Sequence, residues 1–199
     1  MAPIRRLALV EAAIREIGQA GTLNVTVGQI ANRAGVSSAL AHHYFGSKDE
    51  IFLAAMRHIL SNFGQSVRSR LQNAAGPQAR LEAIIDACFG DDQFEPDVIA
   101  AWLMFYVRAQ TSPPTARLLR VYRKRLHTNL MHELRQLLPR PKAYDVAVTI
   151  GALIDGVYLR CALPGDVPDR ARTIAIITDD LDRALTAVIP THQPTRSAM

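Results

Sequence analysis

The chain has 199 residues, of which 49% are hydrophobic and 21% are charged, as in an ordinary globular protein. No stretch approaches the roughly 18 uninterrupted apolar residues of a membrane-spanning helix, and charges interrupt the N-terminus too early for a signal peptide, so we expect a cytoplasmic protein. Residues 1–48 hold five basic residues against two acidic ones, an excess that favours an anionic partner for this part of the chain.

Apolar residues recur at helical spacing along the sequence, and no segment alternates in the manner of a strand, which predicts an all-α fold. Glycine and proline separate the periodic segments. The predicted helices cover residues 4–20, 26–33, 37–43, 47–75, 77–89, 95–110, 113–138, 141–163 and 168–189. We expect a helix-turn-helix domain over residues 3–62, a helical ligand-binding and dimerisation domain over 63–190, and a disordered tail over 191–199.

Two short predicted helices in the N-terminal part are joined by three residues, which is typical of a helix-turn-helix. Thr26 opens the first of them, since TVGQ has the spacing of a capping box, and SKDE at residues 47–50 opens the next long helix in the same way. Ala31 is small enough for the two short helices to cross, and Gly35 permits the turn between them. The second short helix, after Ser37, would present its polar side chains outward.

The adjacent histidines His42 and His43 also suggest a metal site or a proton relay. Adjacent residues on a helix point about 100° apart, however, and no third ligand is nearby. His127 and His132 are five residues apart rather than the four that helical metal ligands need. With no glycine-rich phosphate loop and no nucleophile elbow, we expect no metal, no cofactor and no catalysis, and the histidine segment favours DNA recognition.

The segment VTVGQIANRAGVSSALAHHYFGSKDEIF, residues 25–52, resembles the DNA-binding domain of the TetR family of bacterial repressors. The similarity lies in its IA and AGVS core, its HYF end and the SK that follows. The resemblance implies DNA contacts from Thr26, Ser37, Ser38, Ala39, Leu40, His42, Tyr44 and Lys48, and His43 is expected on the same outward face. Leu40 stands where threonine is common and His42 where an aromatic is usual, so the resemblance implies no particular operator sequence.

The rest of the chain resembles, within that family, the choline-responsive repressors of glycine betaine synthesis, in AWLMFY, NLMHELRQLLP and ALIDGVYLRCALPG. This implies a repressor that a small cation such as choline releases from its operator. A quaternary ammonium cannot donate an N–H hydrogen bond, so its site needs aromatic faces and can include an anionic partner such as a carboxylate. The candidate ligand residues are Trp102, Phe105 and Tyr106 on one helical face and Asp155 and Tyr158 on another. Core packing of these residues is the alternative that stays open.

The segment 142–163 is apolar nearly all round, which favours a homodimer interface shared with the last helix and including Ile154 and Val157. The resemblance implies that, in such a dimer, ligand favours a conformation whose recognition helices no longer fit half-sites about 34–36 Å apart. Three alternatives stay open: a repressor of this family with a different ligand, an architectural DNA-binding protein without a ligand, and a helical enzyme. Cys88 and Cys161 lie in apolar segments and are expected to be buried.

Overall fold

A computed structural model describes residues 2–163 and 169–187. Within these ranges the chain forms nine α-helices and no strand, which confirms the predicted all-α fold. The helices are α1 Ala2–Ala20, α2 Val27–Arg33, α3 Ser38–Phe45, α4 Lys48–Asn73, α5 Gly76–Cys88, α6 Pro96–Ala109, α7 Pro113–Leu134, α8 Arg140–Cys161 and α9 Arg170–Thr186. The tail predicted to be disordered, residues 191–199, lies outside the described residues, as do residues 188 and 189 of the last predicted helix.

Local hydrogen bonds set the start of the short helices. Thr26 and Gln29 form both bonds of a capping box: the Thr26 hydroxyl accepts from the Gln29 N–H at 3.1 Å, and Gln29 Oε1 accepts from the Thr26 N–H at 2.7 Å. Gly35, between α2 and α3, has a φ of +66°, a conformation that other residues adopt only with strain. The Ser47 hydroxyl accepts from the Glu50 N–H at 3.2 Å and opens α4.

Seven of the described helices end one to four residues from the predicted position, and α3, α7 and α4 illustrate the difference. α3 continues past His43 to Phe45, because Phe45 fills the core, and it stops at Gly46, whose φ is +70°. α7 stops at Leu134 rather than at residue 138, since the Leu134 carbonyl accepts from two later N–H groups and the chain tightens into a turn. α4 ends at Asn73, before the glycine and proline that were expected to end it.

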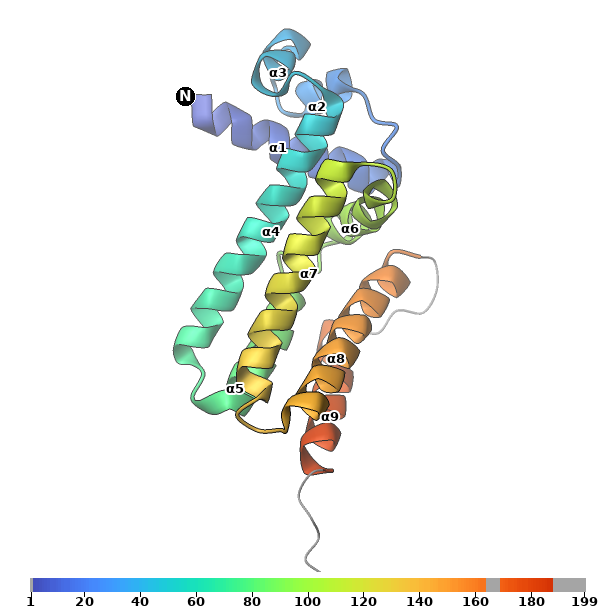
Figure 1. The fold of residues 1–199 in the computed structure, drawn as a ribbon. Helices are drawn as coiled ribbons and strands as arrows, with labels where there is room; N and C mark the ends of the chain where they lie inside the picture. The colour runs from blue at the N-terminus through green and yellow to red at the C-terminus, as the bar shows by residue number, and fades with distance from the viewer. Residues whose placement is uncertain (1, 164–168, 188–199) are drawn as a thin grey trace, which may run out of the picture.

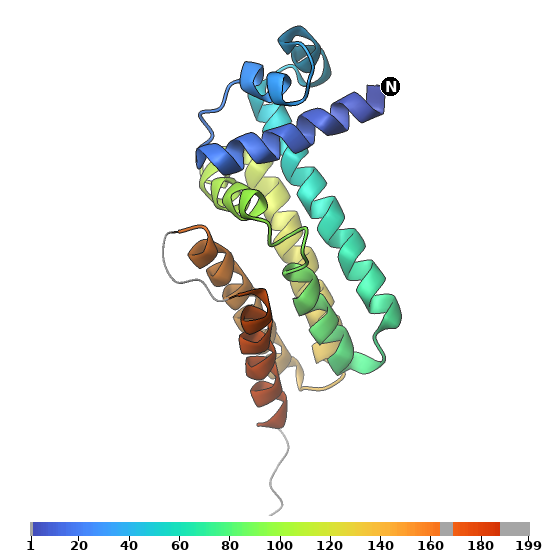
Figure 2. The same ribbon diagram turned by 180° about the vertical axis from the view of Figure 1, so that it is seen from behind.

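The longest helix, α4, connects the two ends of the molecule (Figure 1). Its 26 residues correspond to roughly 39 Å at the usual rise per residue. α2 and α3 lie beyond its first turn, α1 crosses it near that end, and α5 starts from its other end (Figures 1 and 2). The predicted domain boundary at residues 62 and 63 falls inside α4 and stays a prediction.

The helix α6 contacts the N-terminal helices at both of its ends. In its first turn Asp97 approaches α1 so closely that a β-carbon on Gly18 would lie 2.5 Å from the Asp97 α-carbon. In its last turn Arg108 Nη2 donates to Asp49 Oδ2 of α4 at 2.6 Å. A displacement of α6 would therefore reach both α1 and the first turn of α4 through direct contacts.

α8 has one buried face and one exposed apolar face. Its buried residues are Ala143, Val146, Ala147, Ile150, Ile154 and Tyr158. Because Ile154 is 0% exposed within the protomer, the expectation that Ile154 faces a second chain is wrong. Val148 and Leu159 are 48% and 46% exposed, and Ile176 of α9 is 39% exposed, so these residues remain free for a contact with another chain.

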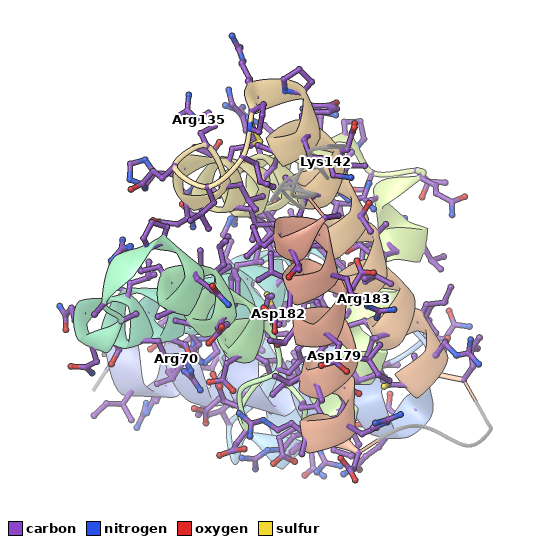
Figure 3. All side chains as sticks on the ribbon, turned by 90° about the horizontal axis from the view of Figure 1, so that it is seen from below. Arg70, Arg135, Lys142, Asp179, Asp182 and Arg183 are labelled. Carbon is purple, nitrogen blue, oxygen red and sulfur yellow. The ribbon has the colours of Figure 1, made fainter. Side chains whose placement is uncertain are left out.

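α9 packs against both α8 and α5. Gln78 Nε2 of α5 donates to Asp182 Oδ1 at 3.0 Å. Seen from below, Asp182 lies on the side of α9 that faces α5, whereas Arg183 lies on the α8 side (Figure 3). No helix in the described ranges is long and apolar enough to cross a membrane.

Candidate nucleic-acid interface and aromatic site

The second helix of the helix-turn-helix, α3, exposes one polar face. Ala41 and Phe45 are buried, so helical spacing turns the residues between them outward. The exposed residues at α3 are Ser37, Ser38, Ala39, His42 and His43. Leu40 and Tyr44, four residues apart, are half-buried along one flank of this face. Because α3 lies at the end of the molecule away from the ends of α5 and α9 (Figure 1), nothing in the described protomer covers the face.

Two of the residues expected to contact DNA also stabilise the local fold. The Ser37 hydroxyl accepts from the Leu40 N–H at 3.2 Å, and the Lys48 ammonium donates to the Leu23 carbonyl at 3.0 Å across the loop between α1 and α2. Ser37 keeps its hydroxyl hydrogen, and Lys48 keeps two N–H donors. Each therefore retains the capacity to donate to a phosphate.

The adjacent histidines are engaged separately. Nδ1 of His42 lies 3.2 Å from the Gly46 carbonyl oxygen, so Nδ1 acts as the donor and leaves Nε2 for a contact outside the helix. The His43 ring packs against Tyr44 with ring centroids 5.7 Å apart. Among the residues that the structure describes, no three histidine, cysteine or acidic side chains form a metal-ligating group.

Aromatic rings from three helices meet around Trp102 of α6. The Trp102 ring centroid lies 5.9 Å from that of Tyr106, 4.9 Å from that of Tyr122 of α7, and 5.7 Å from that of Tyr158 of α8. Trp102 is only 3% exposed. We call these four residues the aromatic cluster; its rings fill the space between α6, α7 and α8.

Asp155 of α8 adds a charge to the edge of the aromatic cluster. The Tyr106 hydroxyl donates to Asp155 Oδ1 at 2.8 Å, and Arg123 Nη2 donates to Oδ2 at 3.0 Å. The guanidinium carbon of Arg123 lies 5.7 Å from the Tyr106 ring centroid, within the range of a cation–π contact. Burial, and then the charge of Asp155, raise the pKa of Tyr106 above its ordinary value, so its hydroxyl stays a donor.

Tyr158 ties the cluster to the end of α5. Its hydroxyl donates to the Cys88 carbonyl, and burial raises the pKa of Tyr158 well above its ordinary value, so this donor persists. Burial also raises the pKa of the Cys88 thiol, which therefore stays protonated and packs as a small apolar side chain, as predicted. Cys161 is half-buried instead of buried.

One feature distinguishes the centre of the cluster from ordinary core packing. The Trp102 Nε1–H is buried and has no hydrogen-bond partner among the described residues, an uncommon state for a buried donor. Phe105 is 0% exposed and packs between Trp102 and Phe52 of α4, with ring-centroid distances of 5.6 Å and 6.5 Å. Phe105 thus links the cluster to α4, while Asp155 lies on the Tyr106 side.

Two residues of this site, Tyr122 and Arg123, were not among those expected from the sequence. Tyr122 lies three residues after Leu119 and four before Leu126, so the helical spacing of these apolar residues in α7 predicts that Tyr122 faces the core. Nothing in the sequence pairs Arg123 with Asp155, because that contact depends on how α7 packs against α8.

Two grooves border the cluster. One, of about 380 Å³, lies between α7 and α8 and has Arg123 and Asp155 at its edge. The other, of about 680 Å³, lies between α4 and α7 and reaches Tyr122. A small ligand therefore has open space next to the Tyr122 ring in one groove and next to the Asp155 carboxylate in the other.

Two protein families match the sequence. Residues 9–55 match the bacterial regulatory proteins of the tetR family, and residues 77–198 match the C-terminal part of BetI-type transcriptional repressors. The HTH-type transcriptional regulator BetI of Brucella suis is 52% identical over 179 residues, which cover 90% of each chain. The regulator of the same name from Agrobacterium fabrum is 46% identical over 185 residues, 93% of this chain and 90% of the relative.

Solved structures show the same fold. A transcriptional regulator from Rhodococcus has a TM-score of 0.81 at 24% identity, over 92% of this chain and 96% of that one. A transcriptional regulator from Saccharomonospora viridis, crystallised in complex with choline, has a TM-score of 0.79 at 22% identity, over 89% and 95% of the chains. At these identities the likeness concerns the fold alone.

Proposed function

Since this chain belongs to the family of BetI-type transcriptional repressors within the tetR family, we propose that it represses genes of glycine betaine synthesis and that choline releases it from its operator. The chain is accordingly a transcriptional regulator and not an enzyme. Regulators of the tetR family bind operator DNA and small ligands and are typically dimers. The observation that carries the choline assignment is the Asp155 carboxylate beside Tyr106, where the positively charged guanidinium of Arg123 already contacts both.

In this proposal the exposed face of α3 enters the major groove of double-stranded DNA, and the protein acts in the cytoplasm. Leu40 and Ala39 would meet apolar base edges, and His42 Nε2 would accept a hydrogen bond from a base. The phosphates or the groups that flank the bases would be contacted by the remaining residues, which are Thr26, Ser37, Ser38, His43, Tyr44 and Lys48. Phosphate contacts position the protein, whereas the base contacts select the operator.

The aromatic cluster would bind the ligand. The trimethylammonium group of choline would lie against the Tyr106, Trp102 and Tyr158 rings near Asp155, with each cation–π contact contributing about 0.5–2 kcal/mol. The choline hydroxyl oxygen could accept from the unpartnered Trp102 Nε1–H. Tyr122 would complete the lining of the ligand site. A displacement of Phe105 on ligand binding would move Phe52 of α4, which it contacts.

Release from DNA would follow from a shift of α6. Because the rings are in contact without ligand, choline must separate them, and α6 carries two of them. Asp97 of α6 contacts Gly18, and Arg108 contacts Asp49, so a moved α6 repositions α1 and the start of α4. Choline would thereby favour a conformation whose two α3 helices no longer match the operator half-sites.

A homodimer would form through the exposed apolar residues of α8 and α9. Leu159→Asp is expected to give monomers by light scattering and to abolish operator binding. Leu137→Asp is the matched control, since Leu137 is also exposed but lies after the end of α7. A stable Leu159→Asp dimer would contradict this assignment.

Footprinting of the DNA upstream of its own gene tests the function. We expect protection of a two-fold symmetric site that disappears when choline is added. Protection that choline leaves intact would identify a repressor with a different ligand. If no small cation changes either the footprint or the thermal unfolding, an architectural DNA-binding protein is the better description.

Variants of Tyr158 test the ring contacts by titration calorimetry. Tyr158→Phe keeps the aromatic face and should retain most of the choline binding, whereas Tyr158→Ala removes the face and should lose it. The Tyr158 hydroxyl bonds to the Cys88 carbonyl, so Tyr158→Phe also shows how far that bond positions the ring. Equal loss in both variants would point to the hydroxyl in place of the ring face.

A further inference from the structure

The cation subsite of the proposed ligand site is occupied by a side chain of the protein. Arg123 makes an ion pair with Asp155 and lies over the face of Tyr106. These are the two kinds of contact that a quaternary ammonium would make there. Both Asp155 oxygens are engaged, one by Tyr106 and the other by Arg123.

We propose that Arg123 is a resident competitor of the cationic ligand, and that choline binds by displacing its guanidinium from Asp155 and Tyr106. The inference rests on the proposed function, which it deepens. Two cations cannot both be strongly attracted to one carboxylate, because the cations repel each other and the first has already neutralised the carboxylate charge. Occupation by Arg123 therefore lowers the affinity for choline.

The surroundings of Arg123 allow the exchange. Its side chain is 56% exposed and that of Asp155 is 29% exposed. When the ion pair opens, water therefore replaces much of the hydrogen bonding and attraction that the guanidinium loses. The groove of about 380 Å³ beside the pair has both residues at its edge. A long arginine side chain can keep its stem on the protein while its head moves into solvent.

The same contact bears on specificity between choline and glycine betaine. Choline is a cation without an anionic group, so it must replace the guanidinium. Glycine betaine carries a carboxylate that can pair with Arg123 while its ammonium lies near Tyr106. Arg123 therefore reduces the preference for choline over glycine betaine that Asp155 alone would impose.

Calorimetric titration of the full-length, DNA-free protein with choline and with glycine betaine tests the proposal. Arg123→Gln should bind choline about two- to fivefold more tightly, the range that a partly exposed ion pair supports. Its glycine betaine affinity should stay the same or fall. Lys124→Gln is the matched control, because it removes the same charge from the neighbouring, exposed position and should bind like the wild type.

Salt dependence separates competition from a structural role. In the wild type, choline exchanges one cation for another, whereas in Arg123→Gln it neutralises a free carboxylate. Choline binding by Arg123→Gln should therefore weaken more steeply with added salt. Arg123→Lys, which retains the charge, should keep the shallow dependence. Trp102, the single tryptophan, provides an independent fluorescence signal for binding in every variant.

The possible results differ in what they overturn. If the wild type binds choline but Arg123→Gln binds it equally or more weakly, the competitor role is wrong and the proposed function stands. Arg123→Met, which keeps the apolar stem, repeats the comparison if Arg123→Gln shows an altered circular dichroism spectrum. If neither the wild type nor these variants bind choline, both the inference and the choline assignment fail.

Discussion

The exposed face of α3 and the aromatic cluster differ in the solvent exposure of their functional side chains and in how many helices supply them. At α3 the side chains are neighbours in sequence, point into solvent, and rely on a fold held by local caps such as that of Ser37. In the cluster they come from three helices and fill the core that they belong to, and all but the half-buried Tyr106 are buried. Binding and stability are therefore separable for most side chains at α3, with the capping residue Ser37 as an exception, whereas in the cluster a single change affects both.

Removal of the central ring should have the largest effect. Trp102→Ala is expected to lower the free energy of unfolding by about 3–5 kcal/mol, because it leaves a cavity between three helices, and to abolish choline binding. His43→Ala, on the exposed face, should change stability by less than about 0.5 kcal/mol while weakening DNA binding. Urea unfolding followed by circular dichroism measures the stability of both variants. Similar destabilisation by the two variants would break the comparison.

The contact between α1 and α6 should show the coupling between the regions. Gly18→Ala places a methyl group against the Asp97 backbone and is expected to destabilise the protein by about 1–3 kcal/mol and to reduce the effect of choline on DNA binding. Gly156→Ala is the control, since outside its own helix backbone no atom lies within 4 Å of its added methyl group. Thermal unfolding and DNA titration with and without choline compare the variants. Unchanged choline control in a destabilised Gly18→Ala would exclude this route.

Base selection should change at α3 with only a small loss of stability, since Leu40 is half-buried and His42 bonds only the Gly46 carbonyl. Leu40→Ala and His42→Ala are each expected to alter preference at one or two operator positions, at a cost of about 1–3 kcal/mol per lost base contact. Selection of binding sites from random DNA would reveal the altered positions. Choline affinity should remain that of the wild type in both. If base preference is unchanged in both variants, another surface reads the operator.

The smallest expected effect concerns one phosphate contact. Lys48→Ala should weaken binding to operator and to random DNA alike and reduce the salt slope of binding by about one unit, since one counterion fewer is released. Tyr44→Phe should weaken both DNAs less, with the slope unchanged. DNA titrations at several salt concentrations give the slope. A changed base preference with an unchanged slope in Lys48→Ala would contradict the phosphate role.

The same contrast explains what could be predicted from the sequence. The helix-turn-helix follows from residues that act on their immediate neighbours, such as Thr26 with Gln29 and the turn at Gly35. Helical spacing likewise identified Trp102 and Tyr106, which do lie together. Phe105 shares their stripe but packs towards α4, because one helical face contacts two neighbouring helices.

Contacts between distant helices could not be predicted in this way. Arg123 reaches Asp155, and Ile154 turns into the protomer, only through the rotation of α8 about its axis as it packs on α7. An apolar sequence sets which helix is buried, but it leaves the direction of each side chain to the packing of the whole bundle.

The exposed apolar residues of α8 and α9 lie far along the molecule from α3 (Figure 1). In the dimer proposed above, a subunit with a defective α3 would therefore still pair with an intact subunit. Co-expressed in excess, such a subunit would draw the intact copies into mixed pairs with one working recognition helix, which hold a palindromic site poorly. Mutations in α3 would then be genetically dominant, whereas mutations that abolish pairing would be recessive.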